Sequence, residues 1–305
     1  MKKYLFIINP VSGKGRGRKH LPEIKDYLDK MSISHEIIIT EKPGHATLIA
    51  NERQNLFDVI VSVGGDGTLN EIINGIDPGS KTILGVIPIG SGNDFAFNLL
   101  MSKNIEESLD IIFRNENHIL CDVCELEYSN GKINSTKKRF INNFGLGFDA
   151  QVAYINQHKK IGSGITSYII AVLRALMKYK SINYTLSFED ERIIGEKLLL
   201  TFGNGTSSGG GFYLTPNAKI NDNLLDITTI EFISRFKLLQ KLPMALINKM
   251  ETVKEAKMYK AEKADISLNG DFYIHTDGEA SLISADKISV KVLNDKLKFI
   301  NNTRN

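Results

Sequence analysis

The chain has 305 residues, an apolar fraction of 42% and a formal net charge of +3. The apolar fraction is sufficient for a hydrophobic core and excludes a disordered chain, and the length predicts one large domain or two of ordinary size. The net charge is small and no basic run is interleaved with aromatic residues, so we expect no nucleic-acid partner.

The first 120 residues alternate predicted strands with predicted helices. The strands are residues 4–9, 36–40, 59–63 and 83–89, and the helices are residues 21–28, 44–55, 69–76, 95–100 and 105–113. We interpret residues 11–18 as a flexible basic loop. The alternation predicts an α/β lobe with a doubly wound parallel sheet. Because ligands of such sheets lie beyond the carboxyl ends of the strands, we expect a cleft there.

Residues 63–71 form a glycine-rich turn between the third strand and its helix. Glycines let the backbone approach a ligand closely, and the free N–H groups of the helix suit a phosphate. Asp66 would repel a phosphate unless a divalent cation lay between them, so we expect a metal ion. The alternative is an ordinary tight turn with an N-capping residue. Residues 90–94 form a second glycine-rich turn after the fourth strand.

The pattern changes after about residue 120. Predicted strands follow at residues 119–127, 138–143, 184–189, 196–202, 225–232 and 287–293. Several alternate apolar and polar residues, which predicts a C-terminal antiparallel β-sandwich lobe. We place the domain boundary at residue 122, giving domains 1–122 and 123–293.

An apolar stripe at helical spacing lies within the second domain. Its members are Ile165, Tyr168, Ile169, Val172, Leu173, Leu176 and Tyr179. The stripe predicts an amphipathic helix that packs on the sandwich. The alternative is a lid or a membrane-facing element.

Cys121 and Cys124 are too few for a disulfide framework. His118 has a spacing to them that can indicate zinc, but no second pair completes a set of four ligands, so we expect reduced thiols. The chain reaches a strand without a signal-peptide pattern, and no apolar run reaches the roughly 18 residues of a membrane-spanning helix. We therefore expect a cytoplasmic protein.

The motifs at residues 9–13, 63–71, 88–95 and 276–279 occur in an order that resembles the diacylglycerol-kinase-type lipid kinases, bacterial soluble branch. The resemblance covers nearly the whole chain. It implies a first lobe of the NAD-kinase and phosphofructokinase type, to which residues 294–305 return. It also implies ATP-dependent phosphorylation of the hydroxyl of a membrane lipid, with diacylglycerol, giving phosphatidic acid, as the leading candidate.

The resemblance also implies roles for single residues. The nucleotide-binding candidates are Asn9, Thr40, Gly64, Gly65, Asp66, Gly67, Thr68, Leu69, Asn70, Glu71, Ser91 and Asn93. Asp66 and Asp122 are candidates to hold a catalytic magnesium ion, directly or through water. Glu279 is the candidate general base for the proton of the substrate hydroxyl, with Asp66 as the alternative.

A second magnesium site is implied by the resemblance at residues 216–226. The family uses the carboxylate that matches Asp222 and the main-chain oxygens that match Lys219 and Leu224, and oxygen ligands suit a hard cation. The family usually has glycine after the aspartate, where this chain has Asn223. Asn tolerates the left-handed conformation, so we expect the turn to form.

Several alternatives for the substrate and the function are left open. The Gly90-Ser91-Gly92-Asn93 turn resembles the sphingosine-kinase version, so a sphingosine-like alcohol or phosphatidylglycerol is an alternative substrate. An NAD kinase also uses a Gly-Gly-Asp-Gly-Thr turn, and an inactive nucleotide- or lipid-binding regulator is a different class. A bilayer substrate implies peripheral association with the inner face of the membrane, for which Lys159, Lys160 and the following helix are candidates. A homodimer is left open.

Overall fold

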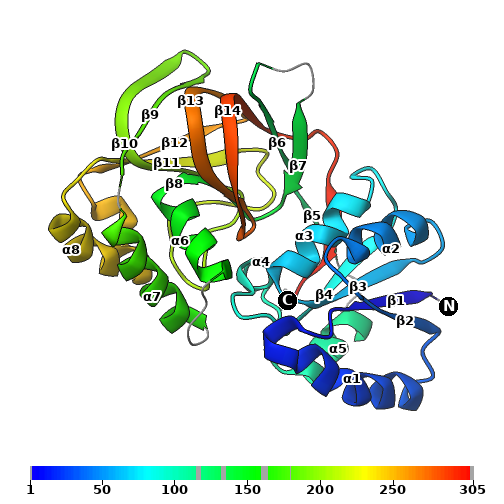
Figure 1. The fold of residues 1–305 in the computed structure, drawn as a ribbon. Coiled ribbons are helices and arrows are strands. Elements are labelled where there is room, and N and C mark those ends of the chain that lie inside the picture. The colour runs from blue at the N-terminus through cyan, green and yellow to red at the C-terminus, as the bar shows by residue number, and fades with distance from the viewer. Residues whose placement is uncertain (1, 115–117, 132–134, 159–163, 179, 303–305) are drawn as a thin grey trace. The chain divides into compact units, whose positions relative to one another are not determined.

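The computed structural model describes residues 2–114, 118–131, 135–158, 164–178 and 180–302. Contacts between Cα atoms divide the chain into two compact units (Figure 1). The first unit comprises Met1–Val123 and Asn294–Asn305, and the second comprises Cys124–Leu293. The chain therefore leaves the first unit once and comes back to it at its C-terminal end.

The first unit is built on a six-stranded sheet. Its elements are β1 (Tyr4–Ile8), α1 (Ser12–Lys30), β2 (His35–Ile39), α2 (His45–Arg53), β3 (Val59–Gly64), α3 (Asp66–Gly75), β4 (Ile83–Pro88), α4 (Asp94–Asn98), α5 (Ile105–Arg114), β5 (His118–Cys121) and β15 (Leu297–Ile300). The strand order is β2-β1-β3-β4-β15-β5, with β5 antiparallel to its neighbour and the other pairs parallel.

The central strands of this sheet are covered on both faces, which explains why the sequence of each is a continuous run of apolar residues. Every residue of β1 and β3 is buried. Figure 1 shows α1 and α5 below the sheet and α2 and α3 above it. Phe113 of α5 packs its ring against Tyr4, Phe6 and Tyr27, with ring centroids 4.8 to 6.4 Å apart. The unit is thus a doubly wound α/β lobe, as the sequence predicts.

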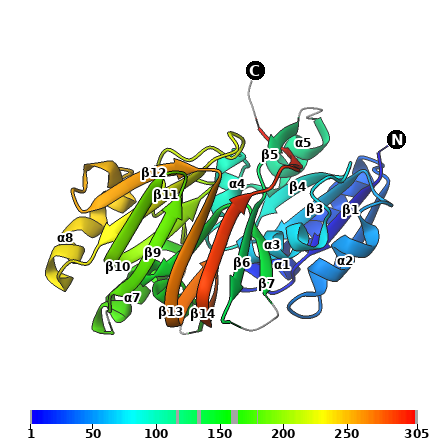
Figure 2. The same cartoon turned by 90° about the horizontal axis from the view of Figure 1, so that it is seen from above.

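The second unit contains an antiparallel sheet of nine strands, and Figure 2 shows α7 and α8 outside that sheet. Its elements are β6 (Cys124–Ser129), β7 (Thr136–Phe140), β8 (Asn143–Gly147), α6 (Phe148–His158), α7 (Gly164–Met177), β9 (Ile182–Phe188), β10 (Glu191–Gly203), β11 (Leu225–Glu231), α8 (Arg235–Leu246), a 3-10 turn (Met250–Thr252), β12 (Ala256–Ala261), β13 (Lys263–Thr276) and β14 (Glu279–Val292).

The sheet of the second unit folds over on itself. The strand order is β12-β11-β10-β8-β13-β14-β6-β7, and β9 pairs with both β10 and β13. Because β8 also lies between β10 and β13, these four strands close a ring of hydrogen bonds. Phe144, Phe202 and Ile274 are buried in the core that the ring encloses. This architecture confirms the predicted antiparallel sandwich.

A second core lies between the outside of the sheet and the helices. Tyr168, Val172 and Leu176 of α7 are buried there with Phe212 and Leu238. The predicted apolar stripe of this helix therefore packs on the sandwich, although Leu173 is 49% exposed. Tyr179 and the side chain of Ile165 lie outside the described residues, as do Lys159 and Lys160. Within the described part of the chain, no helix is long and apolar enough to cross a membrane.

Two predicted segments are corrected by the structure. The single strand expected at residues 119–127 is two strands, β5 and β6, which belong to different sheets because the chain passes between the units at Asp122 and Val123. The basic loop expected at residues 11–18 is shorter than predicted. Only Gly13, Lys14 and Gly15 depart from helical geometry within α1, with φ of 60°, 64° and 87°.

Candidate active site

The glycine-rich turns lie at the point where the strand order of the first sheet reverses. The chain passes from β1 to β2 on one side and then to β3 on the other, so a crevice is expected between the carboxyl ends of β1 and β3. Asn9 follows β1, and its backbone N–H donates to the carbonyl of Val63, 3.0 Å away. Its side-chain Nδ2 donates to Oγ1 of Thr68 at 3.0 Å. Two of the predicted nucleotide-binding residues thus connect β1 to the start of α3.

The two turns pack against each other through bare backbone. A Cβ added to Gly90 would lie 2.3 Å from Cα of Gly65, and one added to Gly65 would lie 2.9 Å from Cα of Gly90. Real Cβ atoms do not approach other atoms this closely, so a side chain at either position would push the turns apart. Gly64 faces a similar limit, because its added Cβ would lie 2.4 Å from Oγ1 of Thr68.

Asp66 connects the first turn to the second. Its Oδ2 accepts a hydrogen bond from the backbone N–H of Asn93 at 2.7 Å, and its Oδ1 accepts from the N–H of Phe95 at 3.3 Å. Asn93 has a φ of 60°, in the left-handed region. Hydrogen bonds to a carboxylate are stronger than those between neutral groups. Asp66 therefore fixes the conformation of residues 93–95, a role that the sequence analysis did not give it.

Arg16 is a basic residue at the turns that the sequence analysis did not single out. Its guanidinium donates to the carbonyl of Gly90 and, through Nε at 3.3 Å, to the carbonyl of Gly13. An arginine is always charged at physiological pH and its planar fork suits phosphate oxygens. The only signal in the sequence was the basic character of residues 11–18, which gave no reason to choose among them.

Of the other residues predicted to bind the nucleotide, Glu71, Thr40 and Leu69 are bonded to neighbouring elements or buried. The carboxylate of Glu71 accepts from the N–H of Ala46 at 3.1 Å, and its carbonyl accepts from the hydroxyl of Thr47 at 2.8 Å. Glu71 therefore joins α3 to the first turn of α2. Thr40 is buried and its N–H donates to the carbonyl of Ile8 at 2.9 Å. Leu69 is also buried, whereas Gly67, Asn70 and Ser91 are partly accessible.

Asp122 lies at the opposite edge of the sheet from Asp66. Cys121 pairs with Leu297, and β15 begins beside Ile83 at the start of β4, whereas Asp66 follows the pair Gly64 and Pro88 at the end of β4. At about 3.3 Å per residue, five residues of β4 alone separate the two edges by roughly 16 Å. The expectation that Asp66 and Asp122 hold one magnesium ion together is therefore wrong.

The surroundings of Asp122 explain its presence. Its side chain is fully buried, and Oδ1 lies 2.6 Å from Nζ of Lys296. A buried carboxylate needs a partner of opposite charge, and the ammonium group supplies it without a metal ion. This ion pair joins the segment that leaves the first unit to the segment that returns to it. We assign Asp122 a structural role.

Glu279 begins β14 at a tight hairpin in the second unit. Asp277 and Gly278 occupy the two central positions with φ of 49° and 86°, and Thr276 pairs with Glu279 across the hairpin. Two consecutive residues with positive φ are typical of a type I′ turn. Glu279 itself is exposed in the structure. Its accessibility fits a group that meets a substrate, and the rigid turn fixes its backbone.

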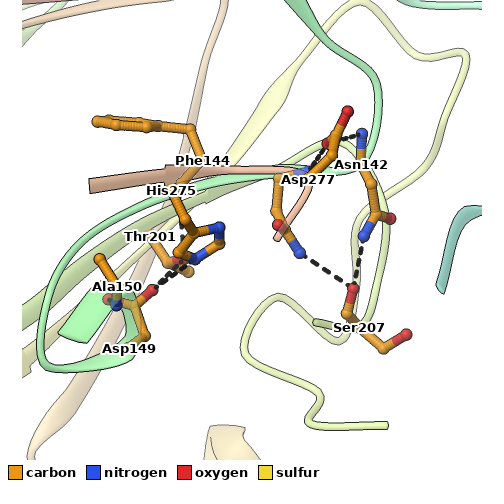
Figure 3. A network of polar contacts seen from close by, with 9 residues as sticks. Asn142, Phe144, Asp149, Ala150, Thr201, Ser207, His275 and Asp277 are labelled. Atoms are coloured by element: carbon orange, nitrogen blue, oxygen red, sulfur yellow. Dashed lines mark hydrogen bonds and ion pairs between the residues drawn. The ribbon is translucent and has the colours of Figure 1, made fainter. Parts of the chain in front are cut away.

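The carboxylate of Asp277 holds this hairpin in place (Figure 3). Its Oδ1 accepts from the N–H groups of Asn142 and Asn143 at 2.9 and 3.0 Å, and its Oδ2 accepts from the N–H of Ile141 at 3.1 Å. Its own N–H donates to the carbonyl of Asn143 at 2.8 Å. Asp277 is 5% exposed. The hairpin that carries Glu279 is thus attached to β8 by a buried carboxylate.

The same network continues into the glycine-rich loop at residues 203–211. The side chains of Asn142 and Asn143 both donate to the carbonyl of Ser207, at 2.8 and 3.1 Å. Asn204 donates to the carbonyl of Ile141 at 2.6 Å. The sequence analysis missed all of these residues. The Asp-Gly pair between two strands is a hairpin signal, but nothing local to it identifies Asn142 or Ser207 as neighbours.

A third group of polar side chains lies next to this hairpin. Thr201, Gly145 and His275 sit side by side on β10, β8 and β13. Asp149, at the start of α6, fills the space that the missing side chain of Gly145 leaves, with Oδ2 at 3.1 Å from the Thr201 hydroxyl and 3.4 Å from Nε2 of His275 (Figure 3). A Cβ on Gly145 would lie 2.1 Å from that oxygen. Glycine is therefore required there.

An apolar cavity of about 50 Å³ lies between the helices and the sheet of the second unit. Its lining includes Phe148, Val152, Tyr168, Phe212, Leu238 and Leu242. Among the described residues of the lining, Asp149 and Lys241 are the charged ones. A cavity needs roughly 10–15 Å³ for each water-sized group, so this one holds a few methylene groups without rearrangement.

Asp222, the predicted ligand of a second metal ion, lies in the turn before β11. Its Oδ1 accepts from the N–H of Leu224 at 3.2 Å, and Asn223 has the left-handed φ of 62° that the turn requires. Nζ of Lys260 lies 3.3 Å from Asp222 and 3.0 Å from Asp226. Burial raises the pKa of Asp226, and the ammonium of Lys260 offsets part of that rise. Both carboxylates are thus paired with Lys260, and a metal ion bound here would have to displace its ammonium group.

The comparisons with known proteins agree with this geometry. Residues 3–126 match the family described as diacylglycerol kinase catalytic domain, and residues 143–298 match the YegS C-terminal NAD kinase beta sandwich-like domain. A curated relative from Staphylococcus saprophyticus, a diacylglycerol kinase by name, is 33% identical over 284 residues, covering 91% of this chain and 89% of that protein. A relative of the same name from Staphylococcus aureus is 32% identical, with 91% and 86% covered.

Solved structures show the same two-part fold. A putative diacylglycerol kinase from Bacillus anthracis has a TM-score of 0.78 at 25% identity, covering 99% of this chain and 97% of that chain. An NAD kinase from Archaeoglobus fulgidus in complex with ATP has a TM-score of 0.54 at 15% identity, covering 98% and 94%, which shows the shared fold. The fold and the paired glycine turns define a phosphotransferase with an alcohol group as acceptor. The chain belongs to the diacylglycerol kinase family.

Proposed function

We propose that this protein transfers the γ-phosphoryl group of ATP to the hydroxyl of diacylglycerol, giving phosphatidic acid. The observation that supports a lipid as the acceptor substrate is the apolar cavity of the second unit, whose lining is almost entirely hydrocarbon. Such a lining favours an acyl chain over the polar groups of a dinucleotide. A full-length chain would need α7 and α8 to move apart, because the cavity holds only a few methylene groups.

The nucleotide phosphates would lie at the switch point of the first sheet. Gly65 and Gly90 let the two turns pack closely there, and Thr68 and Asn93 supply polar groups at the same edge. The N-terminus of α3 adds N–H groups and the positive end of a helix dipole, which favour an anion. Arg16 would add a fixed positive charge.

Asp66 would hold a magnesium ion at these turns. Its carboxylate is fixed by the N–H groups of Asn93 and Phe95 and offers the oxygen ligands that a hard cation prefers. The bound ion would neutralise charge on the phosphates, as in other phosphoryl-transfer enzymes. Asp222 and Asp226 would hold a second ion, with Lys219 and Leu224 contributing main-chain oxygens, once Lys260 releases them.

Glu279 would accept the proton of the lipid hydroxyl. An alcohol is a weak nucleophile at neutral pH, and a positioned carboxylate makes its oxygen more reactive as the bond to phosphorus forms. Asp277 would act as a positioning residue, because its three buried hydrogen bonds fix the hairpin that begins β14. Nucleotide binding and proton transfer therefore depend on different structural units.

The proposal is tested by incubating the protein with magnesium and ATP and with diacylglycerol, sphingosine, phosphatidylglycerol or NAD in parallel. Phosphatidic acid formed from diacylglycerol, well above the products of the other acceptors, supports the proposal. Preferential phosphorylation of NAD would refute the lipid substrate, and preferential phosphorylation of sphingosine would change its head group. ATP binding without any phosphorylated product would favour the inactive regulator.

A further inference from the structure

Helix α8 is apolar on two opposite sides. On its inner side Leu238 and Ala245 are buried, and Leu242 lines the cavity with them. Spacings of four and three residues put these side chains on one face of the helix. This inner stripe explains why the helix packs on the sheet.

The outer side of α8 carries a second apolar stripe. Phe236 is 71% exposed, Leu239 is 42% exposed and Ile247, directly after the helix, is 55% exposed, with the exposed Pro243 between them. At about 100° per residue these four positions fall within roughly 80° of one another and on the side opposite to the inner stripe. Both ribbon views show α8 at the outside of its unit (Figures 1 and 2). An exposed apolar stripe of this kind usually marks an interaction surface.

Basic residues border the outer stripe on both sides. Arg235 lies on one side and Lys237 on the other, whereas Lys241 lines the cavity, and no residue of α8 is acidic. Arg235 also donates to the carbonyl of Met177 at 3.5 Å, which joins α8 to the end of α7, where Met177 is 71% exposed. Lys237 is partly neutralised by Glu255, 2.5 Å away. An apolar stripe between basic side chains is the pattern of a helix that lies in the plane of a membrane surface.

We infer that α8 docks the second unit on an anionic lipid bilayer, with Phe236 and Leu239 inserted between the lipids. The basic border selects this occupant. A second copy of the chain, packed face to face on the same stripe, would bring Arg235 and Lys237 of both copies together at a cost in free energy. Anionic head groups instead attract each exposed lysine or arginine. This surface differs from the expected one at Lys159 and Lys160.

The inference deepens the proposed function and rests on it in one respect. The inner stripe of α8 forms part of the cavity wall, so docking through the outer stripe places the cavity about one helix diameter, roughly 10 Å, from the lipid surface. A lipid that enters the cavity would then pass beside α8 without crossing water. The binding itself needs no catalysis, so the docking and the chemistry can be tested separately.

The experiment is co-sedimentation of the full chain with vesicles of phosphatidylcholine, or of equimolar phosphatidylcholine and phosphatidylglycerol. The test variant is Phe236→Ala with Leu239→Ala, and neither residue lines the cavity. The matched control is Ile194→Ala with Leu282→Ala, which removes side chains that are 63% and 53% exposed on β10 and β14. We expect the α8 variant to bind the mixed vesicles about tenfold or more weakly, because insertion buries most of each apolar side chain.

The control variant should bind the mixed vesicles like the wild type. Arg235→Gln with Lys237→Gln should weaken binding between about fivefold and 25-fold and reduce its salt dependence, since each charge near an anionic surface contributes about fivefold and Lys237 is partly neutralised by Glu255. Equal binding of the α8 variant and the control would overturn the inference. So would a wild-type dimer in solution that the α8 variant converts to a monomer, because the stripe would then cover a second copy.

Turnover on a short-chain diacylglycerol dispersed in detergent separates this inference from the proposed function. The α8 variant should phosphorylate it at the wild-type rate, because no bilayer is involved. If the wild type phosphorylates none of the lipids but binds vesicles through α8, the proposed function fails and the docking surface stands. If it phosphorylates diacylglycerol but the α8 variant and the control bind vesicles equally, the docking surface fails alone.

Discussion

Replacing Asp277 tests the attachment of the Glu279 hairpin. In Asp277→Asn, the amide oxygen can still accept hydrogen bonds from the backbone N–H groups of Asn142 and Asn143. The N–H of Ile141 then faces the amide NH₂ group. One buried donor loses its acceptor, which costs about 1–3 kcal/mol, and the two remaining hydrogen bonds lose their charge. We expect a loss of roughly 2–4 kcal/mol. Asp277→Ala removes both acceptor oxygens, and with them all three hydrogen bonds, and should cost more, a large part of the roughly 5–15 kcal/mol of a typical domain.

The assay for Asp277 is urea unfolding of the whole chain, followed by the fluorescence of its tyrosines. Asp271→Asn is the matched control, because Asp271 is an exposed aspartate on the same strand. We expect the control to change the free energy of unfolding by less than about 0.5 kcal/mol. A midpoint for Asp277→Asn that matches the control would mean that the three hydrogen bonds do not hold the hairpin, and the positioning role would be refuted.

Three further predictions concern the metal sites and the buried thiol. Asp66→Asn should raise the magnesium concentration needed for turnover and lower stability by about 1–2 kcal/mol, because it weakens charged hydrogen bonds to Asn93 and Phe95; wild-type magnesium dependence in a kinetic titration would refute its metal role. Magnesium should raise the thermal midpoint of the wild type more than that of Asp222→Ala, and equal shifts in both would place no metal ion there. Burial, with the charge of Asp122, raises the pKa of Cys121 above its ordinary value of 9.0. The native thiol therefore keeps its proton above pH 9.0 where the unfolded thiol loses it, so the wild type should lose stability relative to Cys121→Ala as pH rises past that value, and parallel pH profiles of unfolding would contradict this.

The periodicity of the first lobe was predictable because each of its central strands is buried on both faces. An apolar run such as residues 59–63 has few alternatives when a glycine turn and an amphipathic helix follow it. The β-strands of the second unit were harder to predict from the sequence. β12 is only half-buried, and β13 begins with an alternation of buried and exposed residues that a register shift between Ser267 and Gly270 interrupts, so a long strand was not evident there.

The placement of candidate residues was predictable where one short motif holds them together, as it does Asp66 and Thr68 at the start of α3. It was not predictable where the partner is distant in the chain. Asp122 lies near a domain boundary in sequence, but only the pairing of Cys121 with Leu297 shows that it sits at the far edge of the sheet beside Lys296. Asn142 and Asp277 are 135 positions apart, and their hydrogen bond leaves no local trace.

The most direct test of the central claim is phosphoryl transfer from ATP to diacylglycerol by the wild type and by Glu279→Gln. We expect the wild type to form phosphatidic acid in a magnesium-dependent reaction. Glu279→Gln should bind ATP as the wild type does, because the nucleotide contacts lie in the other unit, and its turnover should fall by roughly 10²–10⁴-fold with partial recovery at high pH. Wild-type turnover and an unchanged pH profile in Glu279→Gln would show that another group takes the proton, and no phosphatidic acid from the wild type would contradict the proposed reaction.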